Sequence, residues 1–373
     1  MPNRRFIKKA QILIATPLVA LLAACGGTTT IGGTESPSAS QSVAPFPTAG
    51  SGELHIYNWT DYVDTNELKR FEQETGIKVI LDVYDSNETM LAKLQSGATG
   101  YDIIFPSDYM VAQLKELNML QQIDVASFPN GKNIKPEMLN NYWDAGRKFT
   151  APYMYGTSGI ACLLSDPECS QINSWHDYFT STSSKISELK DQQEVVSVAL
   201  RASGTPSSEI CTTDKARYQA AADLLKNFHP SVIESDGALE RIVSGTSTVS
   251  HIWNGEAHRL WLENKDMRYI YPSEGLNLWA DNIAVPIGAP NVDNAKIFIN
   301  WMLDPKNIAA ESNYTGYDNS IVGSSDFMDE SMKNDPAVVV PEDKKSLLTS
   351  TPACLNEARE LYTQVFTTWL SQQ

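Results

Sequence analysis

Three tryptophans in the sequence combine a large aromatic ring with a polar neighbour near the end of a predicted strand. They are Trp59 after residues 54–57, Trp253 at the C-terminal edge of 248–255, and Trp279 in 276–286, which Asp281 closely follows. An indole ring is costly to leave in water, whereas its face attracts cations. Rings beside acidic groups therefore indicate a ligand cleft that suits a small cation, and not a reactive centre.

The histidines indicate neither catalysis nor a metal centre. The five are His55, His176, His229, His251 and His258. None belongs to a His-Glu-x-x-His motif, and the sequence contains no Gly-x-Ser-x-Gly motif and no phosphate-binding glycine loop. Glu256 stands between two histidines in "HIWNGEAH", but on the edge of a predicted strand this spacing defines no metal site. We therefore expect no catalytic residue, no metal ligand and no cofactor.

The segment from residue 53 to residue 107 alternates predicted strands and helices. We expect strands at 54–57, 77–84 and 101–107, and helices at 65–75 and 86–97. Asp64 and Glu67 have the spacing of a capping box before the first helix. This alternation predicts a parallel sheet covered by helices.

The turns after these strands hold the candidate site residues. Trp59 and Tyr62 follow the first strand, and Ser107 and Tyr109 follow the third. Ligands of open α/β sheets bind outside the carboxyl ends of the strands, so these residues should lie together.

Later segments continue the mixed α/β pattern. We expect a strand at 150–164 that crosses between domains with bends at Gly156 and Gly159, strands at 248–255 and 276–286, and helices at 215–228 and 294–305.

Composition indicates a soluble, acidic protein of two domains. The chain has 373 residues, 42% of them hydrophobic, and a formal net charge of −16. Such a charge repels nucleic acid and favours a cationic ligand, although acidity can also serve solubility alone.

The N-terminus has the features of an export signal. Residues 1–24 contain four basic residues and then an apolar run at 11–24, which is too short to span a bilayer. "LAAC" resembles the lipoprotein cleavage motif, which implies a lipid on Cys25; the alternative is an ordinary signal peptide with a chance cysteine. Residues 25–52 then form a flexible linker rich in Gly, Ser and Thr. The motif "NRRFIKK" leaves open whether export uses the general or the twin-arginine route.

Four cysteines remain after Cys25. Cys162, Cys169, Cys211 and Cys354 favour disulfides in an exported protein, and the sequence leaves all three pairings open.

Six strings occur in order between about residues 53 and 320: "IYNWTDYV", "YDSNETMLAKL", "YDIIFPSDYMV", "PYMYGTSGI", "IWNGEA" and "LWADNIAVP". Together they resemble the spermidine/putrescine-binding proteins of bacterial ABC importers. The resemblance implies an α/β protein with the two-lobed type II periplasmic binding protein fold, with mixed sheets and a hinge between the lobes. We place lobe 1 at 53–157 and 282–315, and lobe 2 at 158–281 and 316–373.

The resemblance also implies partners and a location. It predicts a polyamine ligand and the membrane permease of an ABC importer as partners, and no nucleic acid. The protein would act in the periplasm as a monomer, anchored to the membrane by its lipid.

Matching motifs carry the family's ligand-binding positions over to ten residues: Trp59, Tyr62, Ser107, Tyr109, Asp191, Glu194, Trp253, Trp279, Asp281 and Tyr317. A polyamine needs a counter-charge at each ammonium group and apolar walls along its methylenes, which carboxylates and aromatic rings supply. Two departures leave the choice between spermidine and putrescine open. "GYDNSI" lacks the family's Pro-Asn, and Pro352 stands near a family Gln or Glu.

Other interpretations of these residues stay open. Asp191 and Glu194 fit a solvated helix start, Tyr317 fits an ordinary loop, and Asp85, Glu88 and Asp108 fit caps or turns better than ligands. Trp175 and Trp301 are expected in the core.

Other functions also stay open. The same fold carries sugars, iron and amino acids, but an amino-acid binder would need an arginine that none of the motifs places suitably. The remaining alternatives are a protein for another small cationic or polar solute, or a polyamine sensor.

Overall fold

The computed structural model describes residues 45–97, 100–235, 237–350 and 352–373. The predicted signal peptide at 1–24, Cys25 and most of the linker lie outside these residues. Residues Phe46–Gln373 form one compact unit. Among the described residues, no helix is long and apolar enough to cross a membrane.

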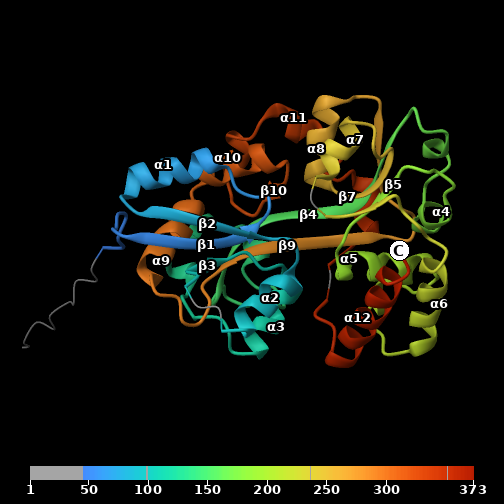
Figure 1. The fold of residues 1–373 in the computed structure, drawn as a ribbon. Helices are drawn as coiled ribbons and strands as arrows, with labels where there is room; N and C mark the ends of the chain where they lie inside the picture. Colours follow the sequence, from blue (N-terminus) through green and yellow to red (C-terminus); the bar gives the residue numbers. More distant parts are fainter. Residues whose placement is uncertain (1–44, 98–99, 236, 351) are drawn as a thin grey trace, which may run out of the picture. The chain divides into compact units, whose positions relative to one another are not determined.

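Strands and helices alternate along the chain, as the sequence predicts (Figure 1). The strands are β1 Glu53–Trp59, β2 Lys78–Tyr84, β3 Ile103–Ile104, β4 Thr150–Leu163, β5 Ile186–Glu188, β6 Val232–Ile233, β7 Val249–Trp253, β8 Met267–Ile270, β9 Leu276–Ala284, β10 Asp318–Asn319 and β11 Leu348–Ser350. The helices are α1 Thr65–Thr75, α2 Asn87–Gln95, α3 Asp108–Glu116, α4 Trp175–Thr180, α5 Gln192–Ala202, α6 Lys215–Leu225, α7 Ala238–Val243, α8 Asn254–Glu263, α9 Val292–Met302, α10 Pro305–Thr315, α11 Glu330–Asn334 and α12 Asn356–Leu370.

The strands of the described chain form a mixed sheet in the order β2-β1-β3-β9-β4-β7-β5-β6. The predicted parallel pairing holds for β1 with β2 and β3, whereas β9 joins β3 and β4 antiparallel. Two long strands, β4 and β9, run through the middle of the molecule from one group of helices to the other (Figure 1). The expected crossing strand at 150–164 is confirmed as β4.

Two hydrophobic cores flank the first part of the sheet. Leu54 and Ile56 face one core with α1 and α9, and Tyr57 faces the other with α2 and α3. This division follows from the two-residue period of a strand. Separate cores surround β5 and β7 and include the C-terminal helix α12.

These cores divide the molecule into a first half around β1, β2 and β3 and a second half around β5 and β7. Both long strands contribute residues to the cores of both halves. On β4, Met154 packs in the first half and Ile160 in the second; on β9, Ile283 and Leu276 divide in the same way. The lobe boundaries remain a prediction, and we note that Tyr317 and Ile321 pack with the first half.

Two local predictions differ from the structure. Asp64 caps α1 by accepting from Asn66 N, but its own N–H donates to Glu311 Oε2 at 2.8 Å, so Asp64 and Glu67 form no capping box. Glu67 pairs with Arg70 instead. Residues 254–255 are the start of helix α8 and not the end of a strand, which places Glu256 on a helix.

Of the two tryptophans expected in the core, Trp175 is fully buried. Trp301 is only half-buried against the first core, under the Arg70 guanidinium.

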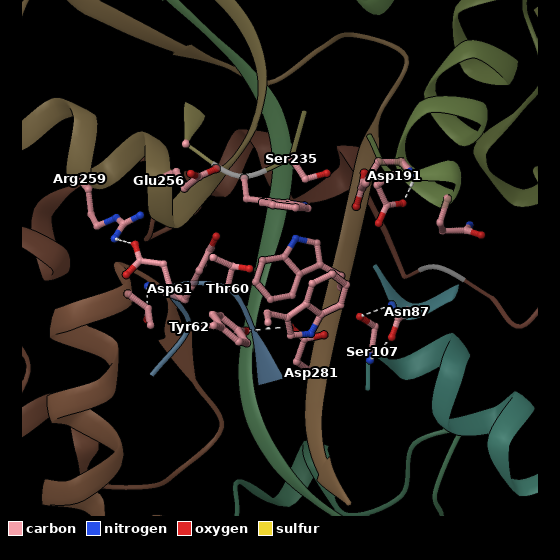
Figure 2. Close-up of a pocket in the computed structure, with 18 of the residues that line it drawn as sticks. Thr60, Asp61, Tyr62, Asn87, Ser107, Asp191, Ser235, Glu256, Arg259 and Asp281 are labelled. Carbon is pink, nitrogen blue, oxygen red and sulfur yellow. Dashed lines mark hydrogen bonds and ion pairs between the residues drawn. The ribbon is translucent and has the colours of Figure 1, made fainter. Parts of the chain in front are cut away.

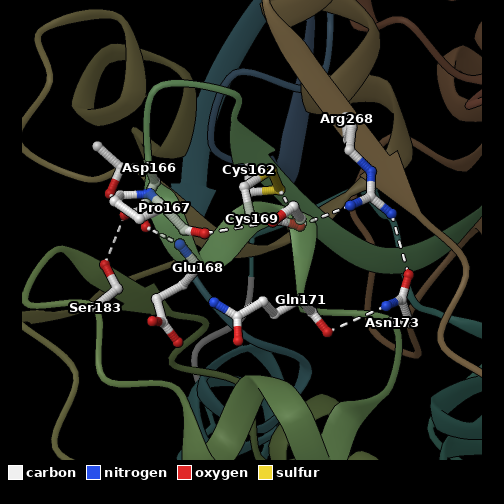
Figure 3. The surroundings of a disulfide bond; sticks show 11 residues. Cys162, Asp166, Pro167, Glu168, Cys169, Gln171, Asn173, Ser183 and Arg268 are labelled. Atoms are coloured by element: carbon white, nitrogen blue, oxygen red, sulfur yellow. Dashed lines mark hydrogen bonds between the residues drawn. A yellow bond between two sulfur atoms is a disulfide. The ribbon is translucent and has the colours of Figure 1, made fainter.

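The four cysteines form two disulfide pairs, Cys162–Cys169 and Cys211–Cys354, with Cα atoms 5.6 and 5.0 Å apart. The first closes the loop after β4, where Arg268 donates to the Cys169 carbonyl at 2.6 Å (Figure 3). The second ties the chain before α12 to the loop before α6.

Candidate ligand-binding site

A cavity of about 300 Å³ opens where the two halves of the sheet meet, and residues of both halves line it. All ten residues predicted for the site are in its wall: Trp59, Tyr62, Ser107, Tyr109, Asp191, Glu194, Trp253, Trp279, Asp281 and Tyr317. The fold thus brings together residues that are up to 258 positions apart in the sequence, from Trp59 to Tyr317.

Two strand ends bring tryptophans together edge to face in the cavity. Trp59 is the last residue of β1 and Trp253 the last residue of β7. Their ring centroids are 6.5 Å apart, with an interplanar angle of 69°. The Trp59 indole N–H donates to the Phe105 carbonyl at 2.9 Å, which fixes the ring against the end of β3.

The third tryptophan reaches the cavity in a different way from the one predicted. Trp279 does not follow a strand; it lies within β9, two residues before Asp281. Residues two apart on a strand share a face, so both side chains point to the same cavity. The ring of Trp279 packs edge-on against Tyr317, with centroids 5.0 Å apart.

A glycine makes room for this ring. Gly156 on β4 is paired with Trp279, and a Cβ atom at Gly156 would lie 2.5 Å from the indole ring. Gly156 was expected to allow a bend, but its φ is not in the left-handed region. Its function in the structure is therefore close approach, because any larger residue would displace Trp279.

Asp281 is the acidic centre of the cavity. Its Oδ2 atom accepts a hydrogen bond of 2.8 Å from the Tyr62 hydroxyl (Figure 2). Its backbone bridges to Ser107, whose hydroxyl accepts from Asn87 at 3.0 Å. Burial raises the pKa of Asp281 to about 6, although the hydrogen bonds from Ser107 and Tyr62 oppose the rise. A cationic ligand would favour the ionised form of this carboxyl and lower its pKa.

Asp191 and Glu194 supply acidic groups from the second half. Asp191 caps α5 by accepting from Glu194 N at 2.9 Å, and Glu194 Oε2 accepts from Asn277 at 2.7 Å. They do start a helix, but both are buried, which contradicts the alternative of a solvated face. Burial raises the pKa of Asp191 well above its usual range, and the charges of Glu88 and Glu194 raise it further.

The wall as a whole is aromatic and acidic. Six aromatic rings line it, together with seven carboxylates, which are Asp61, Asp108, Asp191, Glu194, Glu240, Glu256 and Asp281. Arg259 is the one lysine or arginine among the lining residues. In the described chain, no group of three or more metal-ligating residues is placed to hold an ion. The site can therefore bind a cation by charge and by ring faces.

The family follows from the sequence as a whole. A model of the family described as "Bacterial extracellular solute-binding protein" matches residues 68–340. The chain belongs to this family.

Similar solute-binding proteins are known from several bacteria. "Spermidine/putrescine-binding periplasmic protein 1" of Haemophilus influenzae is 32% identical over 336 residues, which cover 89% of this chain and 90% of that protein. "Spermidine/putrescine-binding periplasmic protein" of Escherichia coli is 32% identical over 286 residues, 76% of this chain and 81% of that protein. The structure of a "Putative spermidine/putrescine ABC transporter from Listeria monocytogenes" superimposes with a TM-score of 0.79 at 31% identity, over 86% of this chain and 99% of the other.

Several lining residues of this solute-binding protein escaped prediction. They are Thr60, Asp61, Asn87, Asp108, Gln193, Ser235, Gly237, Glu240, Glu256, Arg259 and Thr315. Asp108 was expected to be a cap or turn residue; it begins α3, but it is buried in the cavity wall. Glu256 could have been predicted as a lining residue. It lies three residues after Trp253, and at this spacing a helix at 254–263 places both residues on the same side.

Arg259 overturns one expectation. The sequence motifs offer no arginine near the site, yet Arg259 lines the cavity of this solute-binding protein. Its Nη1 atom donates to Asp61 Oδ2 at 2.7 Å, so this guanidinium already has a carboxylate partner. The carboxylate of an amino-acid ligand would have to compete with Asp61 for this guanidinium.

Proposed function

We propose that this solute-binding protein binds a polyamine of the spermidine and putrescine class outside the cytoplasm and delivers it to the membrane permease of an ABC importer. The observation that carries the proposal is the composition of the cavity wall, with seven carboxylates, one guanidinium and six aromatic rings. The names of the relatives from Haemophilus influenzae and Escherichia coli support the same ligand class.

The ten predicted residues divide the work of binding. Asp281, Asp191 and Glu194 pair with ammonium groups, because an unpaired buried charge is very costly. Trp59, Trp253 and Trp279, with Tyr62, Tyr109 and Tyr317, cover the methylenes and attract the adjacent charges. Each cation–π contact contributes about 0.5–2 kcal/mol. Ser107 positions the backbone next to Asp281.

Calorimetric titration tests the ligand class directly. The mature protein is titrated with putrescine, spermidine and spermine, with glucose and glutamate as controls. Binding of at least one amine near micromolar concentration, and of neither control, is the expected result; about −8 kcal/mol corresponds to that affinity. Binding of glutamate or glucose alone would exclude the proposal.

Location, anchoring and assembly complete the proposal. The protein works in the periplasm as a monomer, tethered by a lipid on Cys25 through the linker at 25–52, and its two lobes close over the ligand by a hinge motion. Cys25→Ser should release the protein from the membrane fraction without changing its amine affinity. A lipid-free Cys25 in mass spectra of the native protein would contradict the anchor, and light scattering tests the monomer.

A further inference from the structure

An ion pair crosses one end of the cleft. Arg259 on α8 donates from Nη1 to Oδ2 of Asp61, on the turn after β1, at 2.7 Å. The other oxygen of Asp61 accepts from the Tyr314 hydroxyl at 2.5 Å. Asp61 holds this position with a φ of +52°, in the left-handed region. Each carboxylate oxygen of Asp61 therefore has one protein donor, and Arg259 neutralises the Asp61 charge while the pair is intact.

The opposite end of the cleft has different chemistry. Asp191 lies there near Asn87, while Arg259 and Asp61 lie on the far side of the aromatic rings, with Tyr62 and Asp281 between the two ends (Figure 2). The cleft thus carries buried acids at one end and in its middle, and at the other end the Asp61–Arg259 pair next to the buried Glu256.

Arg259 keeps its charge in this position. Burial lowers the pKa of Arg259, but the hydrogen bond and the charge of Asp61 outweigh burial and leave the pKa raised. The side chain of Asp61 is 49% exposed and that of Arg259 is 21% exposed, so the pair stands at the mouth. By neutralising Asp61, Arg259 removes a counter-charge that an ammonium group extending beyond Asp281 would need.

We propose that the Asp61–Arg259 pair limits the length and charge of the polyamine that this protein accepts. The ligand spans from Asp191 and Glu194 to Asp281, which a diamine or triamine achieves, and Arg259 disfavours the further ammonium group of a tetraamine. Arg259 is therefore a specificity-determining residue. This inference rests on the proposed function.

Two opposite substitutions test the inference, with putrescine, spermidine and spermine as titrants at low salt. Arg259→Gln removes the neutralising charge and frees Asp61, so the ratio of spermine affinity to putrescine affinity should rise about tenfold or more. Asp61→Asn leaves the Arg259 charge without a carboxylate partner at this end, so the same ratio should fall. Arg259→Lys keeps the charge and should stay near the wild-type ratio.

The affinity ratio should rise in Arg259→Gln and fall in Asp61→Asn. These opposite changes distinguish an effect on specificity from an ion pair that only holds the two halves together. A latch that only held the two halves together would make both substitutions shift all three affinities in the same direction. Arg217→Gln on α6 is the matched control, because Arg217 also pairs with a carboxylate, that of Glu209, but does not line the cavity; it should not change the ratio. The inference is overturned if the ratio does not change in Arg259→Gln, or if both variants shift it alike. Failure of the wild-type protein to bind any amine would instead overturn the proposed function.

Discussion

The hydroxyl of Tyr62 donates to Oδ2 of Asp281 at 2.8 Å, across 219 residues of chain. Tyr62 follows β1, and Asp281 lies within β9, which runs through both halves of the sheet. This hydrogen bond fixes the position of the Asp281 carboxylate in the middle of the cavity, with its Oδ2 atom bonded to Tyr62. Because a carboxylate accepts several hydrogen bonds, an ammonium group can join without displacing the tyrosine.

Replacement of Asp281 by Asn should weaken polyamine binding strongly. The substitution keeps the shape and the acceptor for Tyr62 but removes the counter-charge, and loss of one partner of a buried charge pair costs about 2–4 kcal/mol. Calorimetry should show a dissociation constant at least about 30-fold higher. Asp293→Asn is the control, since the Asp293 side chain is 92% exposed on α9. Equal losses in both variants would speak against a local effect.

Truncation of Trp279 should also weaken binding, for a different reason. In the wild-type protein the ring of Trp279 contacts Tyr317 and lies over Gly156, and Trp279→Ala removes this ring. The ligand loses a ring face and apolar contact, so we expect affinity to fall about 10- to 100-fold. Trp301→Phe, at the half-buried Trp301 next to Arg70, should leave affinity unchanged. A Trp279→Ala variant that is folded and binds like wild type would remove this residue from the site.

Binding should depend on pH through Asp281. Its pKa in the free protein is about 6, and a bound ammonium group favours the ionised form, so affinity is full above this pH and falls as pH falls through it. Titration at pH 5 should give an affinity about tenfold lower than at pH 7.5. Asp281→Asn should flatten this dependence. A wild-type protein whose affinity is constant from pH 5 to 7.5 would show that Asp281 does not pair with the ligand.

A second buried acid should affect stability instead of binding. Burial raises the pKa of Glu311 to about 8, far above that of an unfolded chain. The folded state therefore holds a proton that the unfolded state releases, so this group's contribution to stability is full below about pH 4 and is lost as pH rises to about 8.

Glu311→Gln keeps an acceptor for Asp64 N and cannot ionise. Relative to wild type, the variant should gain stability between pH 5 and 8, on the order of 2–4 kcal/mol at pH 8, and little at pH 4. Denaturant unfolding at both pH values measures this. A variant that loses stability at pH 8 but not at pH 4 would indicate that the folded state needs the Glu311 charge, which contradicts the raised pKa.

Most of the site could be predicted because the sequence marks where strands end. Trp59 and Ser107 follow the parallel strands β1 and β3, whose ends share one edge, and Trp253 ends β7, which runs in the opposite direction and meets them at the cavity. Trp279 was assigned to the site for a reason that the structure does not support, since β9 continues past it to Ala284. Asp191 and Glu194 came only from family resemblance, because their local pattern equally fits a solvated helix.

Residues on the helices that close the cavity could not be predicted. Glu240 and Arg259 lie on α7 and α8, and which faces of these helices meet the cleft depends on packing between distant segments. Asp61 is two residues after Trp59, so the sequence could suggest it as a site residue. Its pairing with Arg259 could not be predicted, because the two residues are 198 positions apart and no local sequence pattern connects them.

A crystal structure of the mature protein with spermidine tests the central claim most directly. We expect the alkyl chain between the rings of Trp59, Trp253 and Trp279, with one ammonium group within hydrogen-bond distance of Asp281 and another near Asp191 or Glu194. Spermidine bound outside this cavity, or a cavity left empty at saturating spermidine, would contradict it.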